Sequence, residues 1–460
     1  MKRYINKRTF LKLLALTLPT IASGAALSDA DRKKLPTGKR KVVVVGAGIS
    51  GLAAARELQR HDHEVIVLEA RERTGGRIWT SRTWKDMPLD LGATWIHGVK
   101  GNPITELADE MRIRRLVTSY EKYAIYSTQG ERLTKTGENR LSLLREKVQH
   151  MLKRAGNADE DVSIREAIDP LIKEFPADSE AVRFINFIVN SYFEHEYAGS
   201  ASELSAHWYD SDKEFAGDDA FFADGYDVIT EFLAKDLRVE LSTPVKSIDW
   251  QTPQVFVRTD RGDFEADHVV VTVPLGVLKN ETIQFAPLLP ERKRKAIKSL
   301  GMGVLNKCYL LFPEVFWPED VDWLEHIPEH HGVWTEWVSF KRTANRPVLM
   351  GFNAADRGRE IEAWTDQQIV DSAMKTLRTI FGSNIPGPID YQITRWASDP
   401  FARGSYSFNA LGSTPTSRED LAEPLGGKIF FAGEATSTNY FGTVHGAYLS
   451  GLRAARDVLS

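Results

Sequence analysis

Near the N-terminal end of the chain, the pattern of apolar and polar positions predicts a strand, a turn, a helix and a second strand. Val42 to Val45 is an unbroken apolar run, typical of a strand buried on both faces. A helix is expected from about Ser50 to Arg60. Val65 to Leu68 predicts the second strand, which ends at Glu69. This order is that of a nucleotide-binding unit built on a parallel sheet.

The turn between the first strand and the helix carries glycines spaced G-x-G-x-x-G, at Gly46, Gly48 and Gly51. Without Cβ atoms, these residues let backbone N–H groups approach a pyrophosphate at the start of a helix. Glu69 stands eighteen residues beyond the third glycine, where a carboxylate accepts hydrogen bonds from an adenosine ribose. The combination predicts a dinucleotide site.

Two further segments favour FAD over NAD. The first is E-A-R-x-x-T-G-G-R, whose arginines are placed to reach the diphosphate from its other side; it contributes Glu69, Ala70, Arg71, Gly75, Gly76 and Arg77. The second lies at the opposite end of the chain, where an apolar strand, Ile429 to Ala432, leads to an acid and a glycine-rich helix start; it contributes Gly433, Glu434, Thr443 and Val444. The fold must bring both ends of the chain together around one cofactor.

Composition sets limits on the other possibilities. The chain has 460 residues, 42% of them hydrophobic, which is enough for two domains. A net charge of -4 gives no general attraction to nucleic acid. The single cysteine, Cys308, excludes an intrachain disulfide and a thiolate metal cluster. The two histidine pairs, His61 with His63 and His330 with His331, lack the spacing and the third ligand of a metal site, so no metal is expected.

Three other motifs extend a resemblance over nearly the whole chain, from about Lys39 onward. They are G-A-T-W-I-H-G at 92–98, V-P-L-G-V-L-K at 273–279 and L-G-M-G-V-L-N-K at 300–307. With the glycine-rich segments, they resemble flavin-containing amine oxidases of the monoamine and polyamine oxidase family, polyamine oxidases and the related histone demethylases in particular. The resemblance implies FAD as the cofactor. It adds cofactor contacts at Gly92, Ala93, Thr94, Trp95 and Val245, the last through its backbone to the adenine.

The expected fold is therefore α/β, with two discontinuous domains. A Rossmann-type FAD-binding domain takes residues 41–111, 220–299 and 385–460. A substrate domain with a mixed sheet and helices takes residues 112–219 and 300–384, including apolar strand patterns at Leu300 to Phe312 and Val348 to Asn353. Substrate and cofactor are expected to meet between the domains.

Amine oxidation requires an unprotonated nitrogen, whereas an amine with a lysine-like pKa is almost entirely protonated in neutral water. An apolar aromatic enclosure at the flavin is therefore expected. The resemblance implies that Tyr406 and Tyr440 are the paired aromatic residues facing the flavin. Monoamine oxidases carry a cysteine immediately before the first of these to attach FAD, and this chain has Ser405. We therefore expect FAD bound without a covalent link.

Lys307 is the strongest single catalytic candidate. A lysine in an apolar strand, between Leu305 and Tyr309, is unusual because burying an ammonium is costly. The resemblance implies that it holds a water against flavin N5 and assists reoxidation by oxygen, and that Trp396 lines its pocket. The alternative is a lysine on an edge strand that reaches solvent.

The substrate predictions concern an extended polycation, which needs carboxylates or polar acceptors along its site. His97 matches a polyamine-oxidase position, and Glu194 and Glu196 are further candidate acceptors. The expected reaction is oxidation of a spermine- or spermidine-type polyamine, with O2 reduced to H2O2 and the imine hydrolysed. A monoamine or L-amino acid oxidase and a non-catalytic flavin-binding protein are the alternatives. A histone demethylase shares the motifs but would carry a coiled-coil insertion and a helical module that do not fit this length.

The first residues indicate export. Residues 1–26 have basic residues before an apolar stretch, Leu13 to Ala22, that is too short to span a bilayer and is followed by small residues, as in a signal peptide. Residues 27–40 form a charged linker. K-R-T-F-L-K at 7–12 resembles a twin-arginine signal with lysine in the first basic position, which leaves the general secretory route open. We expect a bacterial periplasmic protein without a membrane span after processing, or a cytoplasmic one if the signal is not used.

Overall fold

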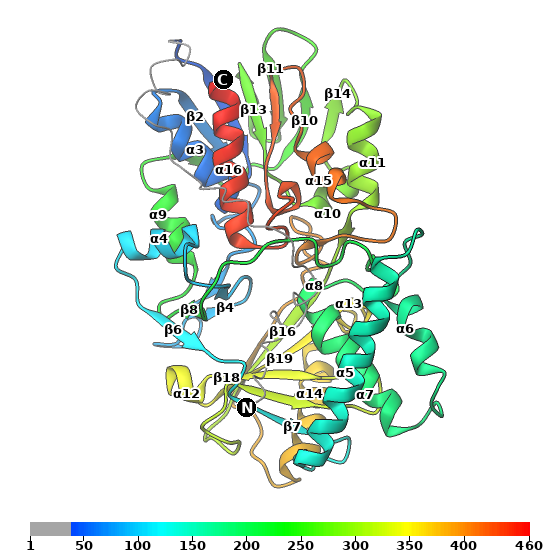
Figure 1. Ribbon diagram of the computed structural model, residues 1–460. Helices are drawn as coiled ribbons and strands as arrows, with labels where there is room; N and C mark the ends of the chain where they lie inside the picture. The colour runs from blue at the N-terminus through cyan, green and yellow to red at the C-terminus, as the bar shows by residue number, and fades with distance from the viewer. Residues whose placement is uncertain (1–37) are drawn as a thin grey trace.

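The computed structural model describes residues 38–460. The expected signal peptide and nearly all of the expected linker lie outside the described residues. Figure 1 shows two bodies, one above the other, with the C-terminal helix in the upper body. The chain passes between the bodies more than once, so each is assembled from segments far apart in the sequence.

The upper body is built on a five-stranded parallel sheet. Its strands, in spatial order, are β22 (Ile429–Phe431), β13 (His268–Val271), β1 (Lys41–Val45), β2 (Glu64–Leu68) and β9 (Arg238–Glu240). Along β1, Val42 and Val44 pack with residues of helix α3 (Ile49–Arg60). Val43 and Val45 point the other way, into a core shared with a four-stranded sheet: β12 (Gly262–Ala266), β11 (Val255–Thr259), β10 (Val245–Asp249) and β14 (Gln284–Ala286). The valine run is thus a strand buried on both faces, as the sequence predicts.

Two glycines allow very close packing in this body. A Cβ on Gly51 would lie 2.0 Å from the backbone oxygen of Gly46, and one on Gly451 would lie 2.1 Å from that of Ser50. The C-terminal helix α16 (Val444–Leu459) therefore packs directly along α3, as Figure 1 shows. This contact brings the two halves of the glycine-rich motif side by side.

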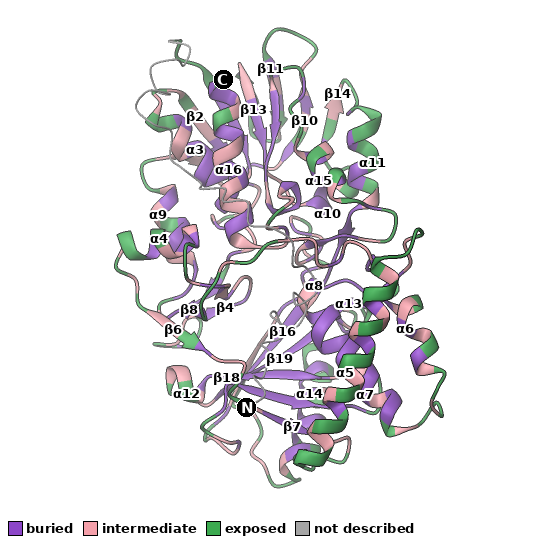
Figure 2. Ribbon diagram, viewed as in Figure 1, coloured by how far each residue is buried: buried purple, intermediate pink, exposed green. Residues whose placement is uncertain are grey.

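The lower body contains a six-stranded sheet. Its strands, in spatial order, are β20 (Asp390–Ile393), β16 (Leu305–Leu311), β19 (Val348–Ala354), β18 (Glu336–Ser339), β17 (Trp323–His326) and β7 (Tyr123–Tyr126). All neighbours are antiparallel except β17 and β7. The helices around it include α5 (Lys135–Gly156), α6 (Ile164–Ile172), α7 (Glu180–Val189), α13 (Ala355–Ile361) and α14 (Asp366–Phe381). Figure 2 shows these strands largely buried, whereas α5 exposes one side.

The discontinuous two-domain architecture is as expected, but one predicted domain boundary differs from the strand pairing. The third FAD-domain segment was expected from residue 385, yet β20 pairs with β16 in the lower sheet. The helix-rich segment 112–219 begins with β6 (Arg115–Thr118) and then β7, which pairs with β17 in the lower sheet. In both cases the partner strand is distant in sequence, so no local pattern indicates the pairing.

A small sheet joins the two bodies near the site. Its order is β5 (Trp95–Ile96), β8 (Asp219–Phe222) and β6, all antiparallel. From α7 the chain continues through a π-helical turn, η1 (Asn190–Glu194), and the short helix α8 (His195–Tyr197). Within residues 38–460, no helix combines the length and the apolar character needed to cross a membrane.

Candidate active site

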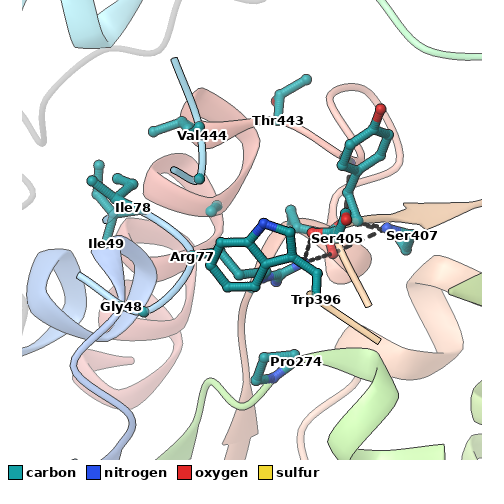
Figure 3. Close-up of a pocket in the computed structure, with 18 of the residues that line it drawn as sticks. Gly48, Ile49, Arg77, Ile78, Pro274, Trp396, Ser405, Ser407, Thr443 and Val444 are labelled. Carbon is teal, nitrogen blue, oxygen red and sulfur yellow. Dashed lines mark hydrogen bonds and ion pairs between the residues drawn. The ribbon is translucent and has the colours of Figure 1, made fainter. Parts of the chain in front are cut away.

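A cavity of about 490 Å³ is lined by residues from both bodies. It extends from the glycine-rich turn at Gly48 to Lys307 and Phe352 of the lower sheet. Figure 3 shows part of its wall, where Arg77, Trp396 and Ser405 lie near one another. Segments near both ends of the chain contribute to it, as the split motif predicts.

The nucleotide end of the cavity is organised by Glu69. One carboxylate oxygen accepts the N–H of Ala47 at 2.7 Å, and the other accepts the N–H of Arg71 at 2.9 Å. Glu69 is 5% exposed and lines the cavity. Because each carboxylate oxygen can accept more than one hydrogen bond, the group remains able to bind ribose hydroxyls.

The glycines of the turn leave room for a ligand. A Cβ on Gly48 would meet nothing closer than the backbone oxygen of Gly75, at 4.0 Å, so the space beside this cavity-lining residue is open. Gly46 also lines the cavity and has a φ of +106°, which favours glycine. Gly51 does not line it; its missing Cβ serves the helix–strand contact.

All the other predicted cofactor residues line the cavity: Ala70, Arg71, Gly75, Gly76, Arg77, Gly92, Ala93, Thr94, Trp95, Val245, Gly433, Glu434, Thr443 and Val444. Their individual roles stay predictions.

The two arginines are held by carboxylates on distant segments. Arg71 makes a bidentate ion pair with Asp399, with its Nη1 and Nη2 at 2.8 and 2.7 Å from the two carboxylate oxygens. Arg77 donates to the backbone oxygen of Ser405 at 2.8 Å and to Glu434 at 2.9 Å. Burial acts to raise the pKa of Glu434, but Arg77 and neighbouring donors lower it overall, so this carboxylate is ionised. The paired charges hold the wall of the cavity in one geometry.

Behind this wall lies a fully buried arginine that the sequence did not reveal. Arg418, on α15 (Pro415–Ala422), donates to Ser407 Oγ at 2.8 Å, and Ser407 in turn donates to Glu434 at 2.6 Å. Its guanidinium also lies 4.0 Å from the ring centre of Phe441, which lines the cavity. Arg418 therefore supports the wall from behind without reaching the cavity.

Lys307 is buried at the centre of the site. Its Nζ donates to the backbone oxygens of Asp90, at 2.8 Å, and Gly92, at 2.5 Å, and to Thr94 Oγ1. Burial lowers the pKa of Lys307 to about 7, against the opposing effect of the Asp90 carboxylate. Strand β16 is paired on both sides and Lys307 is 5% exposed, so the alternative of an edge-strand lysine in solvent is wrong.

Trp396 and Tyr406 both line the cavity. The Trp396 indole donates to the backbone oxygen of Leu91 at 3.2 Å. The Tyr406 hydroxyl donates to the backbone oxygen of His195 at 2.8 Å, which fixes its ring. Each aromatic residue is thus held by a backbone acceptor, although their catalytic roles stay predictions.

Tyr440 lies just behind the cavity lining, and its predicted place facing the flavin stays a prediction. It is not among the residues that line the cavity; its ring stacks on Phe215, with centres 5.0 Å apart and planes 8° from parallel. Phe215 lines the cavity in front of it, and Thr443 and Phe441 line the cavity from the same motif. The Tyr440 carbonyl lies against Gly446, where a Cβ would lie 1.8 Å away.

An aromatic wall continues from Lys307 across the lower sheet. The centres of Trp95 and Trp323 lie 5.8 Å apart in a stacked pair, and Tyr120 stacks on Trp323 at 4.9 Å. Phe352 contacts both tryptophans. All four rings line the cavity, which gives the substrate region an apolar, polarisable surface.

One carboxylate in this wall was missed by the sequence reasoning. Glu336 is 4% exposed and lines the cavity; its two oxygens accept Ser191 Oγ at 2.6 Å and pair with His195 Nδ1 at 2.7 Å. In the ladder between β16 and β19, Lys307 pairs with Phe352. The antiparallel ladder between β18 and β19 pairs Trp337 with Gly351, so the next residues along it, Glu336 and Phe352, lie side by side. An acid at the start of a strand, followed by Trp337 and Val338, was the available signal, and it resembles the signal that singled out Lys307.

Of the three predicted substrate acceptors, His97 and Glu196 line the cavity. Glu194 does not, and its proposed role is corrected. Its carboxylate accepts Asn190 at 2.8 Å and the N–H of Ala201 at 3.0 Å, and pairs with His331 at 2.6 Å. It therefore holds the π-helical turn together.

In the described part of the chain, no group of three or more His, Cys, Asp or Glu side chains is arranged to hold a metal ion.

The family model for flavin containing amine oxidoreductases matches residues 49–459. Together with the fold and the cavity, this match shows that the chain belongs to that family.

The most similar curated proteins include two kinds of enzyme. The chain is 35% identical over 445 residues to "Lysine-specific histone demethylase 1 homolog 3" of Oryza sativa subsp. japonica, covering 92% of this chain and 54% of that protein. It is 33% identical over 441 residues to "Polyamine oxidase 2" of Arabidopsis thaliana, covering 92% of this chain and 89% of that protein. The chain thus spans about half the length of the demethylases it matches.

Among solved structures, a putrescine oxidase redesigned in its cofactor binding matches with a TM-score of 0.73. The identity is 24%, over 92% of this chain and 99% of that one. At this identity the match shows the fold, which is the flavin amine oxidase fold predicted from the sequence.

Proposed function

We propose that this protein oxidises a polyamine of the spermine or spermidine type, with O2 as the electron acceptor. The observation that carries the proposal is Glu336, a buried carboxylate within the aromatic wall. It lies beside Phe352, which pairs with Lys307 on the neighbouring strand. A polyamine has several cationic nitrogens, so one can pair with the carboxylate while another lies against the rings. A relative named as a polyamine oxidase, covered over 89% of its length, supports the same reading.

The cofactor in this proposal is FAD, held without a covalent link. Glu69 would bind the ribose, and the turn at Gly46 and Gly48 would hold the pyrophosphate at the start of α3. When bound, FAD supplies a hydride acceptor at N5 and passes two electrons to O2, giving H2O2. Ser405 precedes Tyr406, and the only cysteine, Cys308, is buried in the core of the lower body, so neither offers a thiol for attachment.

The chain's own side chains prepare the amine for oxidation. The aromatic wall excludes water and favours the uncharged form of the reacting nitrogen. Glu336 fixes the distant cationic nitrogen, and Tyr406 bounds the cavity with its hydroxyl held by His195. Lys307 would assist the reaction with oxygen from its place among three oxygen ligands. The imine product then hydrolyses to an aldehyde and an amine.

The test is a comparison of substrates with purified holoenzyme. We expect H2O2 from spermine and spermidine, and little from tyramine or an L-amino acid. Release of formaldehyde from a methylated lysine peptide, with no response to polyamines, would replace this proposal by the activity named for the demethylase relatives. No response to any amine would favour a non-catalytic flavin-binding protein.

Glu336→Gln tests the observation on which the proposal depends. Removing the charge while keeping the hydrogen-bonding shape should raise KM for spermidine about tenfold or more, since charge-paired contacts contribute about 1.5–3 kcal/mol. Tyramine has no second cationic nitrogen and serves as the internal control, because its low rate of oxidation should be unchanged. Equal effects on both substrates would show that Glu336 only maintains the wall.

A further inference from the structure

His97, Asp219 and Tyr120 meet at one end of the small sheet formed by β5, β8 and β6. The ladder pairs Trp95 with Phe221 and Ile96 with Ala220, so the next two residues, His97 and Asp219, come opposite one another. On the other side of β8, Thr118 pairs with Asp219, and Tyr120 follows two residues later. Strand register therefore brings together groups that are far apart in the sequence.

The contacts of Asp219 fix the orientation of the His97 ring. Its Oδ2 lies 3.0 Å from His97 Nδ1 and accepts the Tyr120 hydroxyl at 3.3 Å. Its Oδ1 accepts the N–H of Gly98 at 2.8 Å. Asp219 is 7% exposed, whereas the His97 side chain is 27% exposed and lines the cavity. With Nδ1–H donated to the carboxylate, Nε2 is the basic nitrogen of neutral His97.

The reaction needs a group that accepts a proton. A polyamine enters largely as ammonium, yet the reacting nitrogen must be uncharged before a hydride can leave its α-carbon. Lys307 is engaged with three oxygen atoms, and Glu336 with Ser191 and His195. His97 combines exposure to the cavity with a carboxylate that stabilises the protonated ring.

We propose that His97 and Asp219 form the dyad that takes the proton from the substrate ammonium. This inference rests on the proposed amine oxidation. The N–H bond of the ammonium breaks as a bond forms between the proton and His97 Nε2, and the electron pair stays on the substrate nitrogen. Asp219 stabilises the imidazolium without taking the proton, and the proton returns to solvent after the reaction. Asp219 is a positioning residue, since it acts through His97.

Other charged or titratable groups surround the dyad. Tyr120 lies beside it and donates to Asp219 at 3.3 Å. The Asn102 amide donates to the His97 carbonyl at 3.1 Å and lies 3.4 Å from His445 Nδ1. The adjacent segment, whose Phe215 backbone oxygen would lie 2.0 Å from a Cβ on Gly98, contributes Asp212, Lys213 and Glu214 to the cavity lining. Apart from the residue that is substituted, these groups are common to the wild-type protein and the variants below, so the variants report on the dyad.

The experiment measures the rate of flavin reduction by saturating spermidine without oxygen, near pH 7 and near pH 10. His97→Gln should be about 100-fold slower near pH 7, the effect typical of losing a general base, and within about threefold of wild type near pH 10, where much of the amine is already neutral. Asp219→Asn should lose less near pH 7 and recover in the same way. The matched control is His207→Gln, another histidine near an aspartate, Asp161, but outside the cavity; its rates should be unchanged.

An equal loss at both pH values would show that His97 only shapes the cavity, and no loss near pH 7 would remove it from proton transfer. If no amine reduces wild-type flavin at either pH, the proposed function itself fails. The dyad is then judged by ¹⁵N NMR of histidine-labelled protein, with His97→Gln to assign the signal. A proton on Nδ1 in the wild-type protein, with an Nδ1 signal that shifts in Asp219→Asn, supports the assigned geometry. A proton on Nε2 in the wild-type protein overturns it.

Discussion

At the scale of single residues, Lys307 is where burial and chemistry meet most directly. Its Nζ donates to three oxygen atoms and the side chain is buried, so its replacement by methionine keeps the volume and removes the donor. We predict that Lys307→Met binds FAD but slows the reaction of reduced flavin with oxygen about tenfold or more. Stopped-flow oxidation of the reduced protein measures this. Unchanged kinetics would remove Lys307 from the oxidative reaction.

The same residue predicts a pH dependence. Because burial lowers the pKa of Lys307 to about 7, the side chain is charged below that pH and neutral above it. A positive charge stabilises the negative charge that forms as oxygen is reduced. The oxidation rate should therefore fall as pH rises through about 7, and this step should be absent in Lys307→Met. A wild-type rate that rises over the same range would contradict the assignment.

At the scale of elements, the cofactor half depends on the contact between α3 and α16. In Gly451→Ala the new Cβ would lie 2.1 Å from the Ser50 backbone oxygen, so the helices must separate. We predict a loss of about 1–3 kcal/mol in the free energy of unfolding and weaker FAD binding. Gly387→Ala, with no atom within 4 Å of the new Cβ, is the matched control. Denaturant unfolding and FAD titration measure both effects, and equal stability of the two variants would contradict the packing argument.

The elements also show what the sequence could predict. The strand at Val42–Val45, its glycines and Glu69 follow from local patterns, because a parallel nucleotide-binding unit is nearly continuous in sequence. Glu194 was misjudged, since a helical acid that is ligated internally resembles one that faces a ligand. Asp219 could not be found, because only strand register brings it to His97.

At the scale of the whole molecule, the chain crosses between two bodies so that its ends complete one cavity. Loss of cofactor contacts in the upper body should therefore also weaken the substrate region.

Export of the protein by a signal in residues 1–26 stays a prediction. Finding the mature protein in the periplasmic fraction, cleaved near residue 26, would support it, and a cytosolic protein with Met1 intact would contradict it.

The central claim is that the cavity holds FAD and a polyamine together, and one measurement tests it most directly. Purified holoenzyme is mixed with spermidine in the absence of oxygen while the flavin absorbance is followed. The account predicts rapid bleaching of the flavin, recovery of the colour with H2O2 release when oxygen is admitted, and FAD that is freed by denaturation. A flavin that stays oxidised with every polyamine, or a protein that takes up no FAD, would contradict it.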